Sequence, residues 1–411
     1  MPFPAAGRPA DEVLSELDHI ASADVDWKGG RVFSLAYFAD DETYRVARAA
    51  NDRFLSTNAL NVAAFPSLRR MQSEVVSTVA GWLNAGDGAA GFMTTGGTES
   101  LLMAVKAARE RGREMGIDEP EMVLPVSAHA AFEKGAHYFG VRSVRAPVGD
   151  DFRADPEAMA AAVTDRTVLV VGSAPQYPQG VIDPITDIAA IAAERDINCH
   201  VDACMGGVTL PYLRRLGEEV PPFDFAVPGV TSMSVDLHKY GYTAKGASVI
   251  IHRDAERRRH QTFVTDNWTG GTYGSSGVLG TKSGGPIASA WAVMQHLGDD
   301  GYLRLTRTAR DATLRLRGLL ERIDGLRVLG ATPVTLVAFT FDDIDPFAVA
   351  DVVGADGWYC DRQGPPASLH CTVHAGHVDT VEPFAEAAAA AAAVVRERGG
   401  QGTDGAYATV D

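Results

Sequence analysis

Short apolar runs alternate with amphipathic segments through the middle of this chain, and this alternation constrains its fold more than any other feature. Runs from Gly91 onward are apolar along most of their length, which is typical of strands buried on both faces. Between several of them lie segments such as Ile185–Arg195, whose apolar residues recur at helical spacing. This order predicts an α/β fold with a mostly parallel sheet covered by helices. The expected strands are Gly91–Thr94, Met122–Val126, Arg142–Ala146, Thr167–Ser173, Asn198–Asp202, Ser232–Asp236 and Ser248–His252.

The segments on either side of this region have different patterns, which predict three parts. Residues 1–60 contain helical patterns and are expected to form an N-terminal helical segment. Residues 61–300 are expected to form the large α/β domain. Residues 301–411 combine helical and strand-like patterns, which predicts a small C-terminal α+β domain whose Gly-rich end, from Gly399, is disordered. Near the second boundary, helices are expected at Pro286–Leu297 and Leu303–Ile323.

Composition limits the partners and the compartment. The formal net charge of −16 argues against nucleic acid or an anionic membrane surface as the main partner. The spacing of the four cysteines suits neither a zinc site nor a disulfide framework, which favours reduced thiols in a cytoplasmic protein. The chain has neither the apolar stretch of a signal peptide at its start nor a window as long as a membrane span. We therefore expect no integral membrane segment and a small-molecule partner.

Lys239 is a candidate for covalent attachment to an aldehyde cofactor. It follows the apolar strand Ser232–Asp236, where a solvent-facing ammonium group is less expected. Chemistry of this kind needs an amine that is uncharged part of the time and is surrounded by groups that fix the cofactor. A lone lysine is more often a solvated surface charge. Here, however, segments that could supply the other cofactor contacts are also present.

Three such segments precede Lys239. Thr94–Ser100 passes from a strand end through glycines into a helix, and its backbone N–H groups suit a phosphate, although any glycine turn before a helix looks similar. It matches neither a P-loop nor a dinucleotide fingerprint. Asp202 ends an apolar strand, where a carboxylate needs a partner such as a pyridinium nitrogen, or else caps the next turn. His129, before a helix, could stack on a cofactor ring or simply cap that helix.

Taken in order, these motifs resemble the pyridoxal 5′-phosphate (PLP) dependent sphingosine-1-phosphate lyases, which are group II decarboxylase-like members of the fold-type I PLP enzymes. The stretches with the resemblance are TTGGTES, SAHAAFEKGAHYFGV, GSAPQYPQGVIDPI, HVDACMGG and SVDLHKYGYTAKGAS. It covers nearly the whole chain from about Asn58 and includes the tail TDGAYATVD. Each motif is weak alone, but together they are specific. The resemblance implies a fold-type I enzyme with a seven-stranded sheet and PLP as its cofactor.

The resemblance also implies a role for each residue on the cofactor side. Lys239 would form the Schiff base, Asp202 would pair with the pyridine nitrogen, and His129 would stack on the ring. These three are the expected catalytic residues. The residues expected to hold the phosphate, or to lie close to it, are Gly97, Thr98, Asp236 and His238.

Other matching positions concern the substrate and a neighbouring subunit. Gly271 and Thr272 match a loop that reaches the site of the neighbouring subunit, which implies a homodimer with shared active sites. Lys245, in TAKG, matches a lysine that the lyases keep close to the substrate. Asn61 and Lys282 are expected on the substrate side as well.

The chain departs from the lyase pattern at three substrate-side positions. Asn61 ends NALN where the lyases have NPLH, Gln179 stands where they commonly have His, and Lys282 lies in GTKSGG where they have GSRPGG. Lysine keeps the charge of arginine but loses its bidentate fork for phosphate. These changes leave open whether the substrate is phosphorylated.

The leading functional hypothesis is therefore a PLP-dependent carbon–carbon lyase. It would cleave a phosphorylated amino alcohol by a retro-aldol reaction into an aldehyde and a phosphoethanolamine-type amine. Amino-acid decarboxylation is the alternative, because either reaction follows from which bond at Cα the pocket aligns. An aminotransferase is less expected, since no arginine for a substrate carboxylate can be assigned, and the complete cofactor set argues against a non-enzymatic protein. Lys245 and Tyr240 are weak candidates for the general base.

Overall fold

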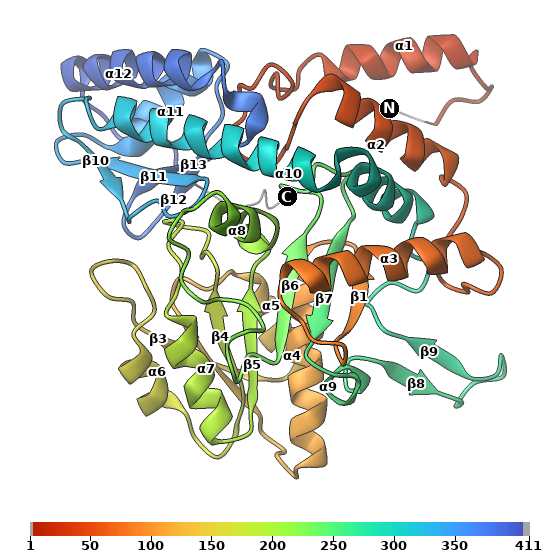
Figure 1. The fold of residues 1–411 in the computed structure, drawn as a ribbon. Coiled ribbons are helices and arrows are strands. Elements are labelled where there is room, and N and C mark those ends of the chain that lie inside the picture. The colour runs from red at the N-terminus through yellow and green to blue at the C-terminus, as the bar shows by residue number, and fades with distance from the viewer. Residues whose placement is uncertain (1–2, 406–411) are drawn as a thin grey trace.

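A seven-stranded sheet forms the centre of the computed structural model, which describes residues 3–405 (Figure 1). Its order is β1-β7-β6-β5-β4-β2-β3, and β7 runs antiparallel to both of its neighbours while the other pairs are parallel. The α/β class and the mostly parallel sheet are thus confirmed, with each strand end within one residue of its prediction. The strands are β1 Ala90–Thr94, β2 Glu121–Pro125, β3 Arg142–Ala146, β4 Thr167–Ser173, β5 Asn198–Asp202, β6 Ser232–Asp236 and β7 Ser248–His252.

The direction of β7 follows from its connection. A parallel crossover needs a dozen or more residues, usually with a helix, whereas residues 237–247 form a short loop without one. The chain therefore turns back beside β6. This loop contains Lys239, so that the lysine lies at the carboxyl end of β6.

Helices cover both faces of the sheet, and separate apolar clusters mark the two faces. On one face lie α3 (Pro66–Trp82), α6 (Pro156–Ala162), α7 (Ile185–Glu194) and α8 (Gly206–Arg215), which share a core with β5. On the other face lie α4 (Gly97–Glu114) and α5 (Ala131–Phe139). Met122 and Val123 belong to opposite clusters, as expected from the alternation of side chains along a strand. The short helix α9 (Ala255–Arg259) follows β7 and contacts α4.

The helix α10 (Gly284–Leu320) joins the large and small domains. Gly298 interrupts it with φ 57° and ψ −170°, so the two helices predicted here meet end to end. The small domain beyond has an antiparallel sheet in the order β10-β11-β13-β12. Strand β12 was not predicted. The elements of the small domain are β10 Leu326–Leu329, β11 Leu336–Phe341, α11 Pro346–Ala355, β12 Asp361–Gln363, β13 Ser368–Thr372, the 3-10 helix Ala375–His377 and α12 Val381–Arg398.

The N-terminal segment packs on both domains. Helix α2 (Asp41–Arg53) lies against α10, while Val32 forms a β-bridge with Tyr359 and Phe33 is buried in the core of the small domain. By contrast, α1 (Ala10–Ala21) buries none of its residues. The N-terminal segment and the small domain therefore share one core, although the sequence patterns placed them in separate parts of the chain.

Two further features differ from the prediction. An unpredicted hairpin of β8 (Phe263–Thr265) and β9 (Tyr273–Ser275) projects away from the sheet at the lower right of Figure 1. The prediction of disorder from Gly399 is wrong for Gly402 and Thr403, whose N–H groups donate hydrogen bonds to aspartates of the small domain at 2.7 and 2.9 Å. Most of the tail motif lies outside the described residues. None of the helices in residues 3–405 has both the length and the apolar character needed to cross a bilayer.

Candidate active site

A cavity of about 490 Å³ lies where β1, β5 and β6 end. Open α/β sheets bind ligands at the carboxyl ends of their strands, and these three strands run in the same direction. The turn after β1, Asp202 at the end of β5 and Asp236 at the end of β6 therefore meet here. The predicted site residues in its wall are Gly97, Thr98, His129, Asp202, Asp236, His238, Lys239 and Lys245.

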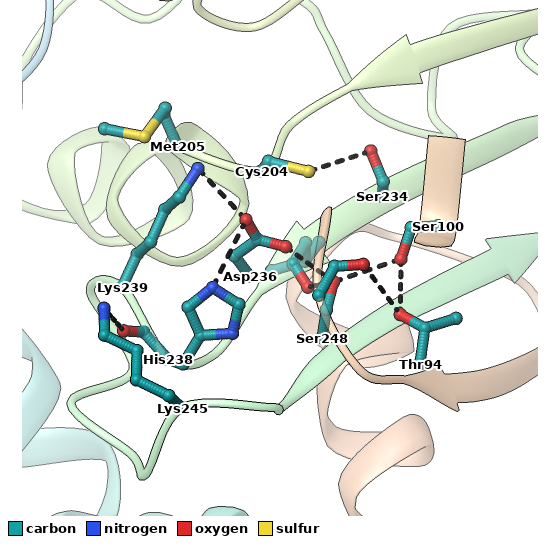
Figure 2. A network of polar contacts seen from close by, with 12 residues as sticks. Thr94, Ser100, Cys204, Met205, Ser234, Asp236, His238, Lys239, Lys245 and Ser248 are labelled. Atoms are coloured by element: carbon teal, nitrogen blue, oxygen red, sulfur yellow. Dashed lines mark hydrogen bonds and ion pairs between the residues drawn. The ribbon is translucent and has the colours of Figure 1, made fainter. Parts of the chain in front are cut away.

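Lys239 and Asp236 form an ion pair in the cavity wall (Figure 2). Lys239 Nζ lies 3.0 Å from Asp236 Oδ2, and His238 Nε2 lies 3.8 Å from the same oxygen. Burial opposes ionisation of Asp236, but the charges of Lys239 and His238 outweigh it and lower the pKa of Asp236 to about 2. Asp236 is therefore a carboxylate at neutral pH and orients the lysine.

A row of buried hydroxyl groups supports Asp236 from behind. Ser248 Oγ lies 2.6 Å from Asp236 Oδ1 and 3.1 Å from Ser100 Oγ, which in turn lies 2.6 Å from Thr94 Oγ1 (Figure 2). These residues come from β7, α4 and β1, and all three are buried. Their hydrogen bonds satisfy polar groups that would be costly to bury alone. The Asp236 carboxylate is thus held rigidly between the strands.

The turn Gly96–Thr98 begins α4 and offers an anion-binding site. The first N–H groups of a helix have no partner within it, and no side chain caps this one. A Cβ atom on Gly97 would lie 2.7 Å from Asp236 Oδ2 and 2.9 Å from Cys204 Sγ, so only glycine fits. Beside the turn, His238 Nδ1 is buried and has no hydrogen-bond partner within residues 3–405. The free donors and this unpaired nitrogen fit a phosphate group.

Asp202 and His129 lie in the wall of the same cavity. Asp202 Oδ1 accepts hydrogen bonds from the Cys204 N–H at 3.0 Å and from Ser234 Oγ at 3.3 Å. His129 Nδ1 accepts the Ala131 N–H at 3.0 Å. Burial lowers the pKa of His129, although Asp202 opposes the effect. A neutral imidazole and a fixed carboxylate suit an aromatic ring with a basic nitrogen.

Lys245 lies at the mouth of the cavity, and Tyr240 lies outside its wall. The Lys245 ammonium donates to the Leu35 carbonyl oxygen and lies 5.1 Å from the centre of the Tyr37 ring. Desolvation and the charge of Lys239 lower the pKa of Lys245, which retains solvent contact. Tyr240 is buried, and its hydroxyl donates to the Val373 carbonyl oxygen at 3.0 Å in the small domain. Of the two candidate bases, only Lys245 lies at the cavity.

The remaining predicted residues do not line the cavity of their own chain. Asn61 is exposed, and its Oδ1 accepts the Ala63 N–H at 3.0 Å. Lys282 is only 6% exposed, and burial lowers its pKa to about 7. Gly271 and Thr272 lie at the exposed tip of the β8–β9 hairpin. Their roles toward the substrate and a second subunit remain predictions.

Sequence reasoning missed several residues of the cavity wall. Glu99, Cys204, Val278 and Leu279 all contribute to it. A glutamate in the first turn of a helix often bonds back to the preceding chain, and this signal could have identified Glu99. Nothing in the local pattern pointed to Val278 and Leu279, because their position depends on the packing of a distant segment.

The chain is similar over most of its length to known proteins. A model described as the pyridoxal-dependent decarboxylase conserved domain matches residues 45–341. A sphingosine-1-phosphate lyase of Oryza sativa subsp. japonica is 39% identical over 91% of this chain and 71% of its own length. A probable L-tyrosine/L-aspartate decarboxylase of Methanothermobacter thermautotrophicus is 35% identical over 80% of this chain and 88% of its own length. The solved structure of a Burkholderia pseudomallei sphingosine-1-phosphate lyase has a TM-score of 0.92 and 40% identity, covering 97% of this chain and 93% of that one.

Proposed function

The chain belongs to the pyridoxal-dependent decarboxylase family, with PLP as its cofactor, and we propose that it is a carbon–carbon lyase of the sphingosine-1-phosphate lyase type. The reaction would cleave a phosphorylated amino alcohol into an aldehyde and a phosphoethanolamine-type amine. The family, the cofactor and the fold-type I architecture predicted from the sequence are confirmed. The observation that supports the proposal most is a single cavity lined by Lys239, Asp202, His129 and the glycine turn.

The cavity residues divide into those that hold the phosphate and those that hold the ring. Gly97, Thr98 and His238 would bind the phosphate, since the turn offers free N–H groups and His238 an unpaired ring nitrogen. Asp202 would pair with the ring nitrogen and keep it protonated. His129 would lie against one face of the ring. Lys239 would supply the amine that attaches to the aldehyde carbon.

When bound, PLP supplies an electron sink for the pair released as a bond at the substrate Cα breaks. Around it, Asp236 stabilises the ammonium form of Lys239, with 3.0 Å between Lys239 Nζ and Asp236 Oδ2. Lys239 Nζ, held beside Asp236 in the cavity wall, would donate or accept a proton at the reacting carbon. Lys245, at the cavity mouth with its pKa lowered, is the candidate to take the hydroxyl proton in a retro-aldol step.

Amino-acid decarboxylation is the second candidate. The similarity to the Methanothermobacter decarboxylase, at 35% identity over 80% of this chain, supports this alternative. Both reactions use the same electron sink and differ in the bond that is aligned with it. The departures from the lyase pattern at Asn61, Gln179 and Lys282 also support this alternative.

We further propose a cytoplasmic homodimer with shared active sites. The β8–β9 hairpin exposes Phe263, Val264 and Trp268 at 52%, 62% and 56%, and apolar side chains on a projecting hairpin favour contact with a second copy. Gly271 and Thr272, at its tip, would then lie at the partner's cavity. All four cysteines are buried free thiols, which suits a reducing compartment.

The proposal is tested by a product assay on PLP-loaded protein given a phosphorylated sphingoid base. We expect a long-chain aldehyde that is absent with Lys239→Ala and unchanged with Lys134→Ala, a lysine outside the cavity wall. Protein that binds PLP but forms no aldehyde would exclude the lyase proposal for this substrate. Carbon dioxide released from an amino acid would then establish the decarboxylase alternative.

A further inference from the structure

Glu99 joins the glycine turn to a segment that is distant in the sequence. Its Oε2 accepts the Thr95 N–H at 2.6 Å and the Thr95 hydroxyl at 2.7 Å, and its Oε1 accepts the Val278 N–H at 2.6 Å. Glu99 is 7% exposed, and a Cβ atom on Gly277 would lie only 2.5 Å from its Oε1. The carboxylate therefore lies between the turn on one side and the cavity wall at Val278 and Leu279 on the other.

Lys282 joins the segment that contains Val278 to the end of β1, just before the turn. Its Nζ donates to the Met93 carbonyl oxygen and to Gln72 Oε1, both at 2.6 Å, and lies 4.0 Å from the centre of the Phe92 ring. Met93 immediately precedes the end of β1, from which the glycine turn emerges. The ammonium is thus buried against the base of the turn and does not line the cavity.

These contacts explain how the turn is kept in shape. Glycine residues give the turn many accessible backbone conformations, and a phosphate binds tightly only when several N–H groups point at it together. The Glu99 carboxylate fixes Thr95 and the Lys282 side chain fixes the Met93 carbonyl oxygen, so both restrict the chain immediately before the turn. Both contacts lead to one segment, Gly277–Lys282.

We infer that Glu99 and Lys282 are positioning residues for the cofactor phosphate, which fasten the turn Gly96–Thr98 to the segment Gly277–Lys282. The inference rests on the proposed binding of the phosphate at this turn. It assigns Lys282 a role behind the cofactor site, in contrast to the substrate-side role suggested by the sequence. Neither residue takes part in breaking bonds.

The test compares the binding of PLP with that of pyridoxal, which lacks the phosphate, by absorbance titration of the full-length apoprotein. Glu99→Gln places an N–H donor against Thr95 or Val278, and Lys282→Met leaves the Met93 carbonyl oxygen without its partner. We expect each change to raise the Kd for PLP roughly tenfold or more, as loss of a charged hydrogen bond does. The Kd for pyridoxal should change little. Lys282→Arg, which keeps the donor, should restore much of the affinity.

Two control variants separate positioning from general loss of stability. Glu121→Gln removes a carboxylate that is 0% exposed at the start of β2, the end of the sheet opposite the cavity. Lys106→Met removes an ammonium on α4 that donates to the carbonyl oxygens of His260 at 2.7 Å and Thr262 at 3.2 Å. We expect both controls to lower the Tm of the apoprotein without changing the ratio of the two dissociation constants.

Three results would overturn the inference. One is unchanged PLP affinity in Glu99→Gln and Lys282→Met, and another is an equal loss for PLP and pyridoxal. The third is a change in the ratio of the two dissociation constants in the control variants as large as in the test variants. If the test variants fail to fold, Glu99→Asp provides the same comparison, because its shorter side chain cannot bond to both Thr95 and Val278. Failure of the aldehyde assay would leave these binding results unaffected, so the inference and the proposed reaction fail separately.

Discussion

Gly97 lies where the glycine turn, the Asp236 carboxylate and the Cys204 thiol meet. Any Cβ atom at this position would approach Asp236 Oδ2 to 2.7 Å, which is closer than ordinary packing allows. Since Asp236 also pairs with Lys239, a displaced carboxylate would move the lysine as well. The absence of a side chain at Gly97 therefore preserves the positions of the glycine turn, Asp236 and Lys239 relative to one another.

At the residue scale we predict that Gly97→Ala raises the Kd for PLP by roughly tenfold, because overpacking a tight site costs about 1–3 kcal/mol. Absorbance titration of the apoprotein measures the effect. Gly81→Ala is the matched control, since a Cβ atom there would meet nothing within 4 Å. Equal PLP affinity in Gly97→Ala and the unchanged protein would show that the turn has more room than the structure indicates.

The hairpin β8–β9 is the element whose role a single chain does not explain. It projects from the large domain (Figure 1). It exposes apolar side chains and contains the predicted partner-facing residues at its tip. The segment after it, Gly277–Lys282, returns to its own chain's cavity wall through Val278 and Leu279. One continuous element would thus serve two cavities, one at its tip and one at its base.

At the element scale we predict that two inactive variants restore activity when they are co-expressed. Lys239→Ala removes the amine, and Gly271→Val strains the hairpin tip, where φ is +94°. In a mixed dimer, the site with an intact Lys239 receives an intact hairpin from its partner, so aldehyde formation should return. Lys239→Ala with Asp202→Ala is the control, because neither site of that mixture is complete. Equal inactivity of both mixtures would contradict shared sites.

Across the whole molecule, several histidines are buried in neutral form. His200 in β5, His252 in β7 and His377 in the small domain are each 3% exposed or less. Burial lowers the pKa of each to about 4. A histidine whose pKa is lower in the folded protein binds a proton more readily after unfolding, so acid favours the unfolded state. This loss of stability occurs between pH 6.5, the ordinary pKa of histidine, and about pH 4, the pKa in the folded protein.

At the scale of the whole molecule we predict that the free energy of unfolding falls as pH decreases from 6.5 toward 4. Each of the three histidines should contribute ~1.4 kcal/mol for every pH unit within this window. Urea unfolding of the apoprotein at pH 7, 6 and 5 measures the slope. His252→Gln should reduce the slope by one histidine's share. A free energy of unfolding that is the same at pH 7 and pH 5 would exclude this source of acid sensitivity.

The predictable part of the fold and the site has a local physical basis. Apolar runs such as Thr167–Ser173 are recognisable because a strand covered on both faces needs apolar side chains throughout. Asp202 and Lys239 were recognisable because a charge at the end of such a strand needs a partner. The β8–β9 hairpin and β12 were not predicted, because strands of three residues contain too few alternating positions to form a recognisable pattern.

The sequence by itself therefore determined the seven strands of the central sheet, the family, the cofactor and the order of the motifs, since each depends on residues close together in the chain. Only the tertiary structure decided that Lys282 is buried behind the glycine turn, that Glu99 bonds to Val278, and that Phe33 enters the small-domain core. These contacts join segments far apart in the chain, and they form only when packing the sheet and helices brings the segments together. The spacing of residues along the chain does not predict such contacts, because burial and charge pairing between distant segments are properties of the assembled core.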